Sequence, residues 1–446
     1  MGDDMADDQT PAGAAPSAAE AMPATAGAEG AVTDAAATRV AAGGGRAEAG
    51  VLVALVSSAV PVERGRLERA VHAAVSRRGW DARVQWVEAA ESWSAALAAD
   101  DADAFLVMPG EAVDLPLDLD LDVDPDLRAA VGPGTGATTP PIVRFDLGAR
   151  EFDPSPALVH HVRALGLEGL QFVVPSAIAA ARHPAVRVSY GADREQYGDW
   201  REPSSALRGE ADAARPGASV TPAPIGVLVH GGFYRSRWQA GLMDELAVDL
   251  GRRGWASWNL EYRRPDLHGW AATLSDLHAG IARLESLRTA PDQPVVLFGH
   301  SAGGQLVLQL AEEIAASGAS AAVPVALSVS LAGVVDLVAA HDRYMGEGAV
   351  AIALGGSPAD LPERYAAASP IAYAHRAATW LLVQGVDDSA DLVEMNRRLA
   401  ASAAVSHPEL LQRAGHHFSV IDPTTEIWRA TMDRVTELLR PDTDRS

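Results

Sequence analysis

At 446 residues the chain is long enough for two or three domains of ~100–200 residues each. Its formal net charge is −23, from 36 basic and 59 acidic residues. Such an excess of negative charge repels a phosphate backbone, so we expect no nucleic-acid partner. The chain has no cysteine, which excludes disulfides, thiolate catalysis and cysteine-ligated zinc and leaves an oxygen or a nitrogen as any covalent nucleophile.

The first ten residues, MGDDMADDQT, are acidic, whereas a secretory signal begins with basic residues followed by an apolar run. We therefore expect a cytoplasmic protein. The longest apolar stretch, residues 321–340, contains Pro324, Ser328, Ser330 and Asp336, and its pattern favours a buried strand with its loop. We expect no membrane partner.

Residues 1–49 consist largely of Ala, Gly, Pro, Asp and Thr. Such a segment buries too little apolar surface to offset the entropy of ordering, so we predict a disordered tail. From Val51 onward, short apolar runs surround a helix-patterned segment at 63–80, and this alternation predicts a parallel sheet with both faces covered. The strands that we predict here are residues 51–56, 82–87, 102–110, 140–147 and 167–174.

Between the third and fourth of these strands, residues 111–127 alternate leucine or valine with aspartate. We interpret this segment as an exposed acidic loop or edge strand. A calcium site is not predicted, because the glycines and the spacing of a calcium-binding loop are missing.

A second series of strands and helices begins near Val186. Residues 295–314 combine a strand, a turn and a helix within it. The other predicted strands are 224–232, 255–264, 324–331 and 379–388, with helices at 239–254 and 273–287. The two series predict a tail at 1–49 and two α/β domains, at 50–185 and 186–446.

The sequence Gly-His-Ser-Ala-Gly, from Gly299 to Gly303, joins the apolar strand to the helix. In a Gly-x-Ser-x-Gly turn of this kind, side chains at the two glycines collide with neighbouring elements, and the serine is held in a strained backbone geometry above the sheet. Glycine-flanked serines also occur in ordinary turns, but the strand before and the helix after favour a nucleophile. We predict that Ser301 attacks the substrate.

A serine hydroxyl needs a base, itself oriented by an acid, in the chain order Ser, Asp, His for this architecture. The predicted strand TWLLVQGVDD ends in acidic residues, and we predict Asp388 as the acid, with Asp387 and Asp391 as alternatives. The segment LLQRAGHHFSVIDP follows with two adjacent histidines, His416 and His417, and we predict the base there.

Cleavage of an ester or amide also needs backbone N–H donors for the developing oxyanion. Ala302, the residue after the nucleophile, supplies one of them. The glycine-rich segment HGGFYRSRW follows a predicted strand and offers Gly231, Gly232 and Phe233 as further donors. These four residues are the predicted oxyanion hole.

Three histidines outside this set, His160, His161 and His230, have no partner ligand at helical or zinc-type spacing. We therefore expect neither a metal nor a cofactor. A further group of aromatic residues near the predicted strands suits either core packing or the wall of a substrate pocket. They are Phe233, Tyr234, Trp238, Trp258, Tyr262 and Trp270.

The motifs HGGFYR, WNLEYRR, GHSAGG, ERYAAASP and GHHFSVIDP occur in this order. With them, the chain from about Val186 to Leu439 resembles bacterial serine esterases of the α/β-hydrolase fold that are related to kynurenine formamidase. The resemblance implies a triad of Ser301, Asp388 and His417. Two features depart from the family pattern. The usual His-Gly before the acid is Gln384-Gly385, and the usual Val-Pro after it is Asp391-Leu392.

The motifs DADAFLVMPG, PPIVRFDLGARE and VRALGLEGLQFVV resemble type II dehydroquinase, over about Val51 to Ala181. This resemblance implies a flavodoxin-like fold and a family that dehydrates 3-dehydroquinate in large symmetric oligomers. The family's tyrosine after the first strand, its asparagine before Pro-Gly and its histidine ending the fourth strand are absent. Their places hold Ser57–Pro61, Met108 and Phe145, so we expect no dehydration activity.

The predicted fold is therefore α/β, with a flavodoxin-like parallel-sheet domain followed by an α/β-hydrolase domain. The predicted function is hydrolysis of a small-molecule carboxylic ester through an acyl-enzyme. One alternative is an amidase or arylformamidase that uses the same triad. Another is that the N-terminal domain serves as a scaffold or ligand-binding module for the hydrolase, in a homo-oligomer that it assembles. The sequence does not identify the substrate.

Overall fold

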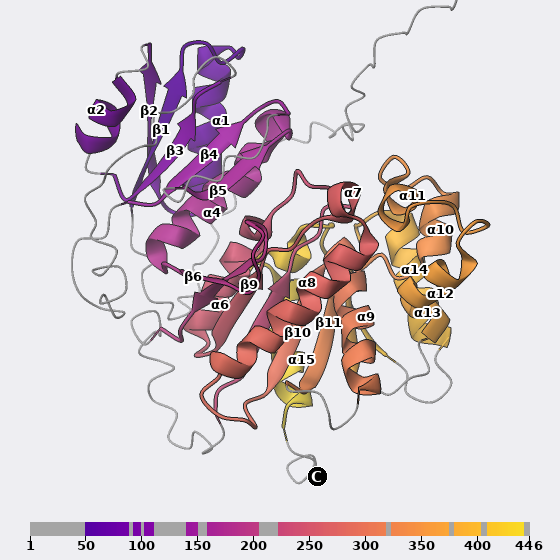
Figure 1. The fold of residues 1–446 in the computed structure, drawn as a ribbon. Helices are drawn as coiled ribbons and strands as arrows, with labels where there is room; N and C mark the ends of the chain where they lie inside the picture. The colour runs from indigo at the N-terminus through magenta and orange to yellow at the C-terminus, as the bar shows by residue number, and fades with distance from the viewer. Residues whose placement is uncertain are drawn as a thin grey trace, which may run out of the picture. The chain divides into compact units, whose positions relative to one another are not determined.

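A computed structural model describes residues 50–88, 92–99, 102–110, 140–149, 158–204, 222–317, 323–373, 379–402 and 408–440. The predicted tail at 1–49 and the predicted acidic loop at 111–127 lie outside these residues. These described residues all belong to one compact unit. They form two sheets within it (Figure 1).

The first sheet has five strands in the order β2-β1-β3-β4-β5, and all of their pairings are parallel. This is the strand order of flavodoxin-like folds, as predicted. Leu52, Ala54 and Val56 of β1 pack on one face of the sheet, and Val53 and Leu55 pack on the other. The elements of this part are β1 (Val51–Ser57), α1 (Arg64–Ser76), β2 (Asp81–Val87), α2 (Ser92–Ala99), β3 (Ala104–Met108), β4 (Ile142–Asp146), β5 (Leu158–Arg163), η1 (Gly166–Gly169) and α4 (Leu170–Arg182).

The fifth strand was predicted wrongly. Residues 167–174 are helical, since they form the end of η1 and the start of α4, and the fifth strand is β5. An apolar run of this length suits a buried helix as well as a buried strand, and α4 buries most of its residues. The true strand was overlooked because its sequence, LVHHVR, places two histidines in the middle, and both are buried.

The second sheet has eight strands in the order β13-β12-β11-β10-β8-β9-β7-β6. The pairings from β13 to β9 are parallel, whereas β7 pairs antiparallel with both β9 and β6. This mixed sheet with crossed-over central strands is the α/β-hydrolase arrangement, as predicted. Its strands are β6 (Val186–Ser189), β7 (Tyr197–Arg201), β8 (Ile225–Val229), β9 (Ala256–Leu260), β10 (Val295–His300), β11 (Val325–Leu331), β12 (Trp380–Gly385) and β13 (Glu409–Arg413).

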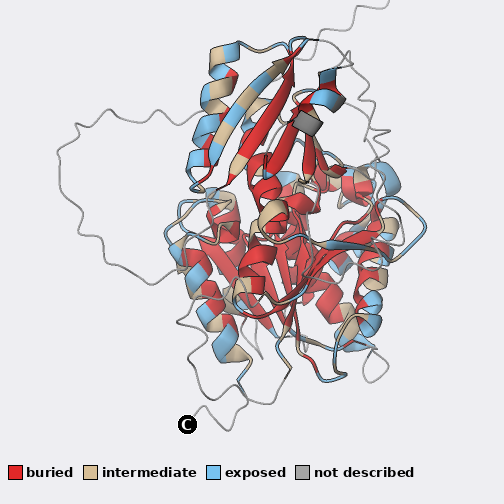
Figure 2. Ribbon diagram, turned by 90° about the vertical axis from the view of Figure 1, so that its left-hand side faces the viewer, coloured by how far each residue is buried: buried red, intermediate tan, exposed pale blue. Residues whose placement is uncertain are grey.

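Helices cover both faces of this sheet. Apolar residues of α8, α9 and α14 pack in one core cluster, and those of α6 and α15 pack in the other. Side chains of β10 belong to both clusters, with Val295 and Leu297 in the first and Val296 and Phe298 in the second. Figure 2 shows these central strands as buried. The helical elements are η2 (Ala240–Met243), α6 (Asp244–Arg252), α7 (Pro265–His268), α8 (Trp270–Arg283), η3 (Leu284–Ser286), α9 (Ala302–Ala316), α10 (Leu337–Asp342), α11 (Ala349–Leu354), α12 (Pro362–Ala368), α13 (Pro370–Tyr373), α14 (Ala390–Ser402), η5 (Ser419–Ile421) and α15 (Glu426–Leu438).

Strands β8, β10, β12 and β13 are near neighbours in the second sheet, and all four run parallel. Their carboxyl ends therefore meet at one edge, where open α/β sheets bind their ligands. The segments carrying Gly231, Ser301, Asp388 and His417 each follow one of these strands. Within the described ranges, no helix combines the length and the apolar character that crossing a bilayer requires.

Candidate active site

Ser301 stands between β10 and α9 with φ 55° and ψ −117°, a backbone conformation that is costly for a residue with a side chain. A Cβ atom at Gly299 would collide with the carbonyl group of Gly303, and one at Gly303 would collide with the carbonyl oxygen of Val229. The turn therefore requires glycine at both positions. It holds Ser301 at the N-terminus of α9 with 2% of its surface exposed.

His417 and Asp388 form a hydrogen-bonded pair, with His417 Nδ1 2.9 Å from Asp388 Oδ2. The carboxylate also accepts hydrogen bonds from Gln384 Nε2 at 2.9 Å and from the backbone N–H of Ser389 at 2.6 Å. Burial by itself raises the pKa of Asp388, but its hydrogen bond to His417 and the charge of that histidine outweigh burial and hold the pKa below its usual value. Asp388 therefore stays ionised and accepts the Nδ1 proton, which leaves Nε2 of His417 free.

The alternative residues for the acid and the base have other partners. Asp387 Oδ2 accepts a hydrogen bond from the N–H of Gly415 at 2.8 Å and so fixes the loop before the histidines. Asp391 forms an exposed ion pair with Arg343 at 2.7 Å. His416 is exposed, and its Nδ1 accepts a hydrogen bond from the backbone N–H two residues later at 3.2 Å. Of these candidates, the structure brings together Asp388 and His417.

His300, the residue before the serine, connects Ser301 to the histidine loop. His300 Nε2 donates a hydrogen bond to the carbonyl oxygen of His417 at 3.1 Å, and the two rings lie 4.8 Å apart. Burial, followed by the charge of His417, lowers the pKa of His300 to about 3, so the ring is neutral. Ser301 donates its backbone N–H to Leu331 O at 2.8 Å, and the described contacts include no hydrogen bond of its hydroxyl.

Gly231 is the part of the predicted oxyanion loop that the structure places against the serine. A Cβ atom at Gly231 would collide with the carbonyl oxygen of His300 and would stand 2.8 Å from Ser301 Cβ. Ala302 is the first residue of α9, where the N–H groups have no partner within the helix and the helix dipole favours negative charge. N–H groups of the loop and of the helix are thus available beside Ser301.

The backbone of the predicted oxyanion loop, residues 230–238, is strained after Gly231. Gly232, Phe233 and Tyr234 have φ values of 116°, 48° and 61°, and the latter two are rare for residues with side chains. Trp238 packs over Gly232 so closely that a Cβ atom there would collide with its ring.

His230, at the start of this loop, is held in place by contacts with Tyr262 and Gly231. Its ring stacks on Tyr262 with centroids 4.5 Å apart, and the hydroxyl of Tyr262 donates a hydrogen bond to the carbonyl oxygen of His230 at 2.8 Å. Burial, with a contribution from the charge of Arg264, lowers the pKa of His230 to about 3. A neutral imidazole therefore donates its Nδ1 proton to the carbonyl oxygen of Gly231 at 2.8 Å.

The other two histidines that could suggest a metal form buried pairs with carboxylates. His160 Nε2 lies 3.0 Å from Asp244 Oδ2, and His161 Nε2 lies 2.7 Å from Asp146 Oδ2. Among the described residues, no group of three or more histidine, aspartate or glutamate side chains is arranged to hold a metal ion.

The candidate pocket aromatics divide into two groups. Four are buried in the core cluster on the α8 and α9 side of the sheet, whereas two are half-buried near the oxyanion loop. The core residues are Tyr234, Trp258, Tyr262 and Trp270, and the half-buried residues are Phe233 and Trp238. Packing therefore explains the first group.

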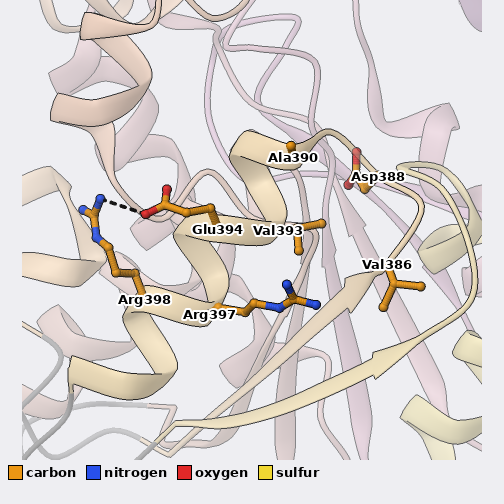
Figure 3. A pocket seen from close by; sticks show the side chains of 7 residues that line it. All are labelled: Val386, Asp388, Ala390, Val393, Glu394, Arg397 and Arg398. Atoms are coloured by element: carbon orange, nitrogen blue, oxygen red, sulfur yellow. Dashed lines mark hydrogen bonds and ion pairs between the residues drawn. The ribbon is translucent and has the colours of Figure 1, made fainter.

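A hollow of about 520 Å³ adjoins the acid (Figure 3). It is lined by Val386, Asp388, Ala390, Val393, Glu394, Arg397 and Arg398. None of these residues belongs to the serine turn or to the oxyanion loop, so we do not assign the hollow to the substrate. Figure 3 shows Arg397 reaching from α14 toward Val386, and Glu394 paired with Arg398.

No sequence motif pointed to the residues that hold Asp388 in place. Asn396 in α14 donates hydrogen bonds to Gln384 Oε1 at 3.0 Å and to the carbonyl oxygen of Gly333 at 2.9 Å. The side chain of Gln384 then donates to Asp388. Gln384 occupies the place of the histidine in the family pattern. This departure from the pattern was the sequence feature that could have pointed to Gln384.

The sheet order and the strained serine turn define the fold class of the C-terminal part, which is the α/β-hydrolase fold. Residues 212–401, less than half of the chain, match the family model described as BD-FAE.

Solved structures that resemble the chain include three bacterial or gut-microbial esterases. One is a truncated form of a carbohydrate esterase from gut microbiota, with 18% sequence identity and a TM-score of 0.46, covering 56% of this chain and 94% of that chain. Esterase B from Lactobacillus rhamnosis has 16% identity and a TM-score of 0.45, with 61% and 93% covered. A bacterial heroin esterase has 18% identity and a TM-score of 0.44, with 58% and 84% covered. No curated protein matches the chain.

Proposed function

We propose that the chain hydrolyses carboxylic esters through an acyl-enzyme formed on Ser301. His417 Nε2 accepts the hydroxyl proton as Ser301 Oγ bonds to the carbonyl carbon. Asp388 holds the imidazole in the tautomer that leaves Nε2 free and stabilises the imidazolium that forms. His417 then gives the proton to the departing alcohol. Water attacks the acyl-enzyme with His417 as base, which releases the acid and returns the proton to Ser301.

Charge that develops on the carbonyl oxygen needs donors that are already in place. The N–H of Ala302 at the start of α9 and the N–H groups of Gly231, Gly232 and Phe233 are the proposed donors. Because both sets are held by strained or glycine-dependent backbone, they need little reorganisation during the reaction. Loss of one such donor costs an enzyme about 3–4 kcal/mol of transition-state stabilisation.

One observation carries this proposal: the His417–Asp388 pair lies beside the serine turn. His300 provides the link, because it precedes Ser301 in the chain and bonds to the backbone of His417 at 3.1 Å. Three segments that are far apart in the sequence therefore meet at one edge of the sheet. Such a set of residue types at one edge matches the requirements for acyl transfer.

The proposal is tested with a fluorophosphonate probe, which reacts with activated serines. We expect stoichiometric labelling of the wild type, and no labelling and no hydrolysis of p-nitrophenyl acetate by Ser301→Ala. Ser286→Ala is the matched control, because Ser286 is an exposed serine in η3 outside the site. Labelling that persists in Ser301→Ala would overturn the proposal.

The same residues serve for an ester or an amide, and a substrate pair separates the two reactions. p-Nitrophenyl acetate and the corresponding p-nitroanilide share the acyl group and differ in the leaving group. We expect turnover of the ester to exceed that of the anilide, because p-nitrophenolate departs readily whereas the anilide nitrogen must be protonated before it can leave. N-Formylkynurenine turned over faster than both would instead identify the chain as an arylformamidase.

For residues 50–185, we propose a flavodoxin-like domain that is similar to type II dehydroquinase and lacks its activity. The parallel order β2-β1-β3-β4-β5 supports this proposal. So does Phe145, which is buried in the core where the family has a catalytic histidine. Incubation of the full chain with 3-dehydroquinate should give no dehydrated product, and product formation that survives Ser301→Ala would contradict the proposal.

A further inference from the structure

Phe172 lies between the two loops of the candidate active site, although it belongs to the N-terminal part of the chain. It comes from α4, the helix that packs on β3, β4 and β5. Its ring makes an edge contact with Trp238 at a centroid distance of 5.0 Å and an interplanar angle of 75°. It also contacts Phe418 at 5.0 Å and 54°. One side chain thus joins the segment after β8 to the segment after β13.

Each of the two contacted aromatics adjoins the proposed machinery. The Trp238 ring packs directly over Gly232, a proposed oxyanion donor. Phe418 follows His417 in the chain, and its ring lies 5.3 Å from the ring of His417 and 5.5 Å from that of His300. Aromatic pairs at these distances prefer defined geometries, so the position of one ring constrains the next.

Polar contacts from the N-terminal part hold the same loop. Arg163 Nη2, at the end of β5, donates a hydrogen bond to the carbonyl oxygen of Ser236 at 3.1 Å. The backbone N–H of His161 donates to Gln239 Oε1 at 3.3 Å. The segment after β8 is therefore contacted at residues 236, 238 and 239 by the first sheet and its helix.

Helix α4 is itself anchored to the hydrolase part. Ser176 Oγ, one turn after Phe172, donates a hydrogen bond to Asp244 Oδ2 at 2.7 Å. Asp244 is fully buried and also accepts from Arg201 Nη2 at 3.0 Å. Phe172 therefore projects from a helix whose place is fixed by buried, charge-assisted hydrogen bonds.

We infer that Phe172 is a positioning residue for the proposed ester hydrolysis, through which the N-terminal part holds the oxyanion loop and the histidine loop at a set separation. The inference rests on the proposed function. The donors act on the substrate through Gly232, and the base acts through His417, so their separation determines whether both meet the same carbonyl group. A misplacement of about 1 Å can cost an enzyme about 100-fold in rate.

The experiment compares Phe172→Ala, Phe172→Tyr and Trp86→Ala in the full chain. Phe172→Ala removes the ring that joins the loops, and Phe172→Tyr retains it. Trp86 is the matched control, because it is a partly exposed aromatic of β2 in the first sheet, with its ring 4.7 Å from the Arg64 guanidinium and its Nε1 2.9 Å from Glu68 Oε1. For each protein, active sites are first titrated with the fluorophosphonate probe. The kcat and KM for p-nitrophenyl acetate and the unfolding midpoint are then measured.

For Phe172→Ala we expect kcat per titrated site to fall about tenfold, which corresponds to about 1.4 kcal/mol in the barrier, with KM changed less than twofold. The probe should react more slowly by a similar factor, and Phe172→Tyr should restore both rates. Trp86→Ala should keep kcat, whatever its unfolding midpoint. A lower unfolding midpoint of Phe172→Ala with unchanged kcat per titrated site would show a merely structural residue and overturn the inference. Absence of probe labelling in the wild type would instead overturn the proposed function.

Discussion

Three aspartates lie within the six residues after β12, and each has a different partner. Asp388 bonds to His417, Asp387 bonds to the backbone of Gly415, and Asp391 pairs with Arg343 at the surface. The sequence narrowed the acid to these three. It could not decide among them because the direction of each side chain depends on a turn in which the N–H of Asp387 donates to the carbonyl oxygen of Gly415, 28 residues later.

The adjacent aspartates allow a matched test of the acid. We expect Asp388→Asn to reduce kcat by about 10⁴-fold, as in other triads where the amide favours the wrong imidazole tautomer. Asp387→Asn should keep kcat within a few-fold, because its partner is a backbone N–H rather than the imidazole. Both rates are measured with p-nitrophenyl acetate at pH 8. Equal losses in the two variants would remove Asp388 from the triad.

At the scale of elements, the central strands of the second sheet were easier to predict than the strands at its edges. The buried strands β8, β10, β11 and β12 are mostly apolar, which a sequence displays directly. The short edge strands β6 and β13 carry polar residues and were not predicted, because their pairing depends on neighbours that are distant in the chain. The segment 167–174 failed for the opposite reason, since its apolar run suits a helix equally well.

The short connection between α10 and α11, residues 343–348, contacts the predicted oxyanion loop. Tyr344, Gly346, Glu347 and Gly348 all have φ between 51° and 73°, a conformation that is costly for Tyr344 and Glu347 but not for the two glycines. Arg235, from the oxyanion loop, donates hydrogen bonds to its carbonyl oxygens at 2.9 and 3.2 Å. No sequence pattern indicated this contact, because it forms only when the folded chain brings the two segments together.

Gly346→Ala tests whether this connection supports catalysis. An added Cβ atom would stand 2.6 Å from the Phe233 ring, so we expect displacement of the oxyanion loop and a fall in kcat of about tenfold or more, with little change in KM. Gly355→Ala is the matched control, because its φ of 84° gives a similar backbone strain while its Cβ atom meets only the end of Arg364 at 3.4 Å. If both variants lose stability alike and keep the same kcat, the connection has no role in positioning the loop.

At the scale of the whole molecule, the two sheets belong to one compact unit. A buried charged side chain, that of Asp244, links the two sheets. Asp244 accepts hydrogen bonds from His160 and Ser176 of the N-terminal part and from Arg201 and Asn259 of the hydrolase part. Burial raises the pKa of Asp244, but Arg201 and His160 outweigh burial and lower it. Composition reveals a charge of −23 but not which charges are buried, because burial is a property of the folded chain.

Two buried histidines make the fold sensitive to acid. Burial lowers the pKa values of His230 and His300 to about 3, whereas a histidine in an unfolded chain has a pKa of about 6.5. Between these values the unfolded chain binds two protons that the folded chain does not. The free energy of unfolding therefore falls as the pH is lowered from about 6.5 toward 3, by up to about 1.4 kcal/mol per pH unit for each histidine. We expect urea unfolding at pH 7.0 and 5.5 to show this loss of stability.

A substitution assigns the effect to one of these histidines. His300→Gln retains a side-chain N–H for the carbonyl oxygen of His417 and removes the titrating ring, so the decline in unfolding free energy between pH 7.0 and 5.5 should be smaller by about one proton's contribution. His416→Gln is the control, because that ring is exposed and its removal leaves the buried pair in place. A decline in His300→Gln as steep as in the wild type would show that His300 is not the group whose protonation destabilises the fold.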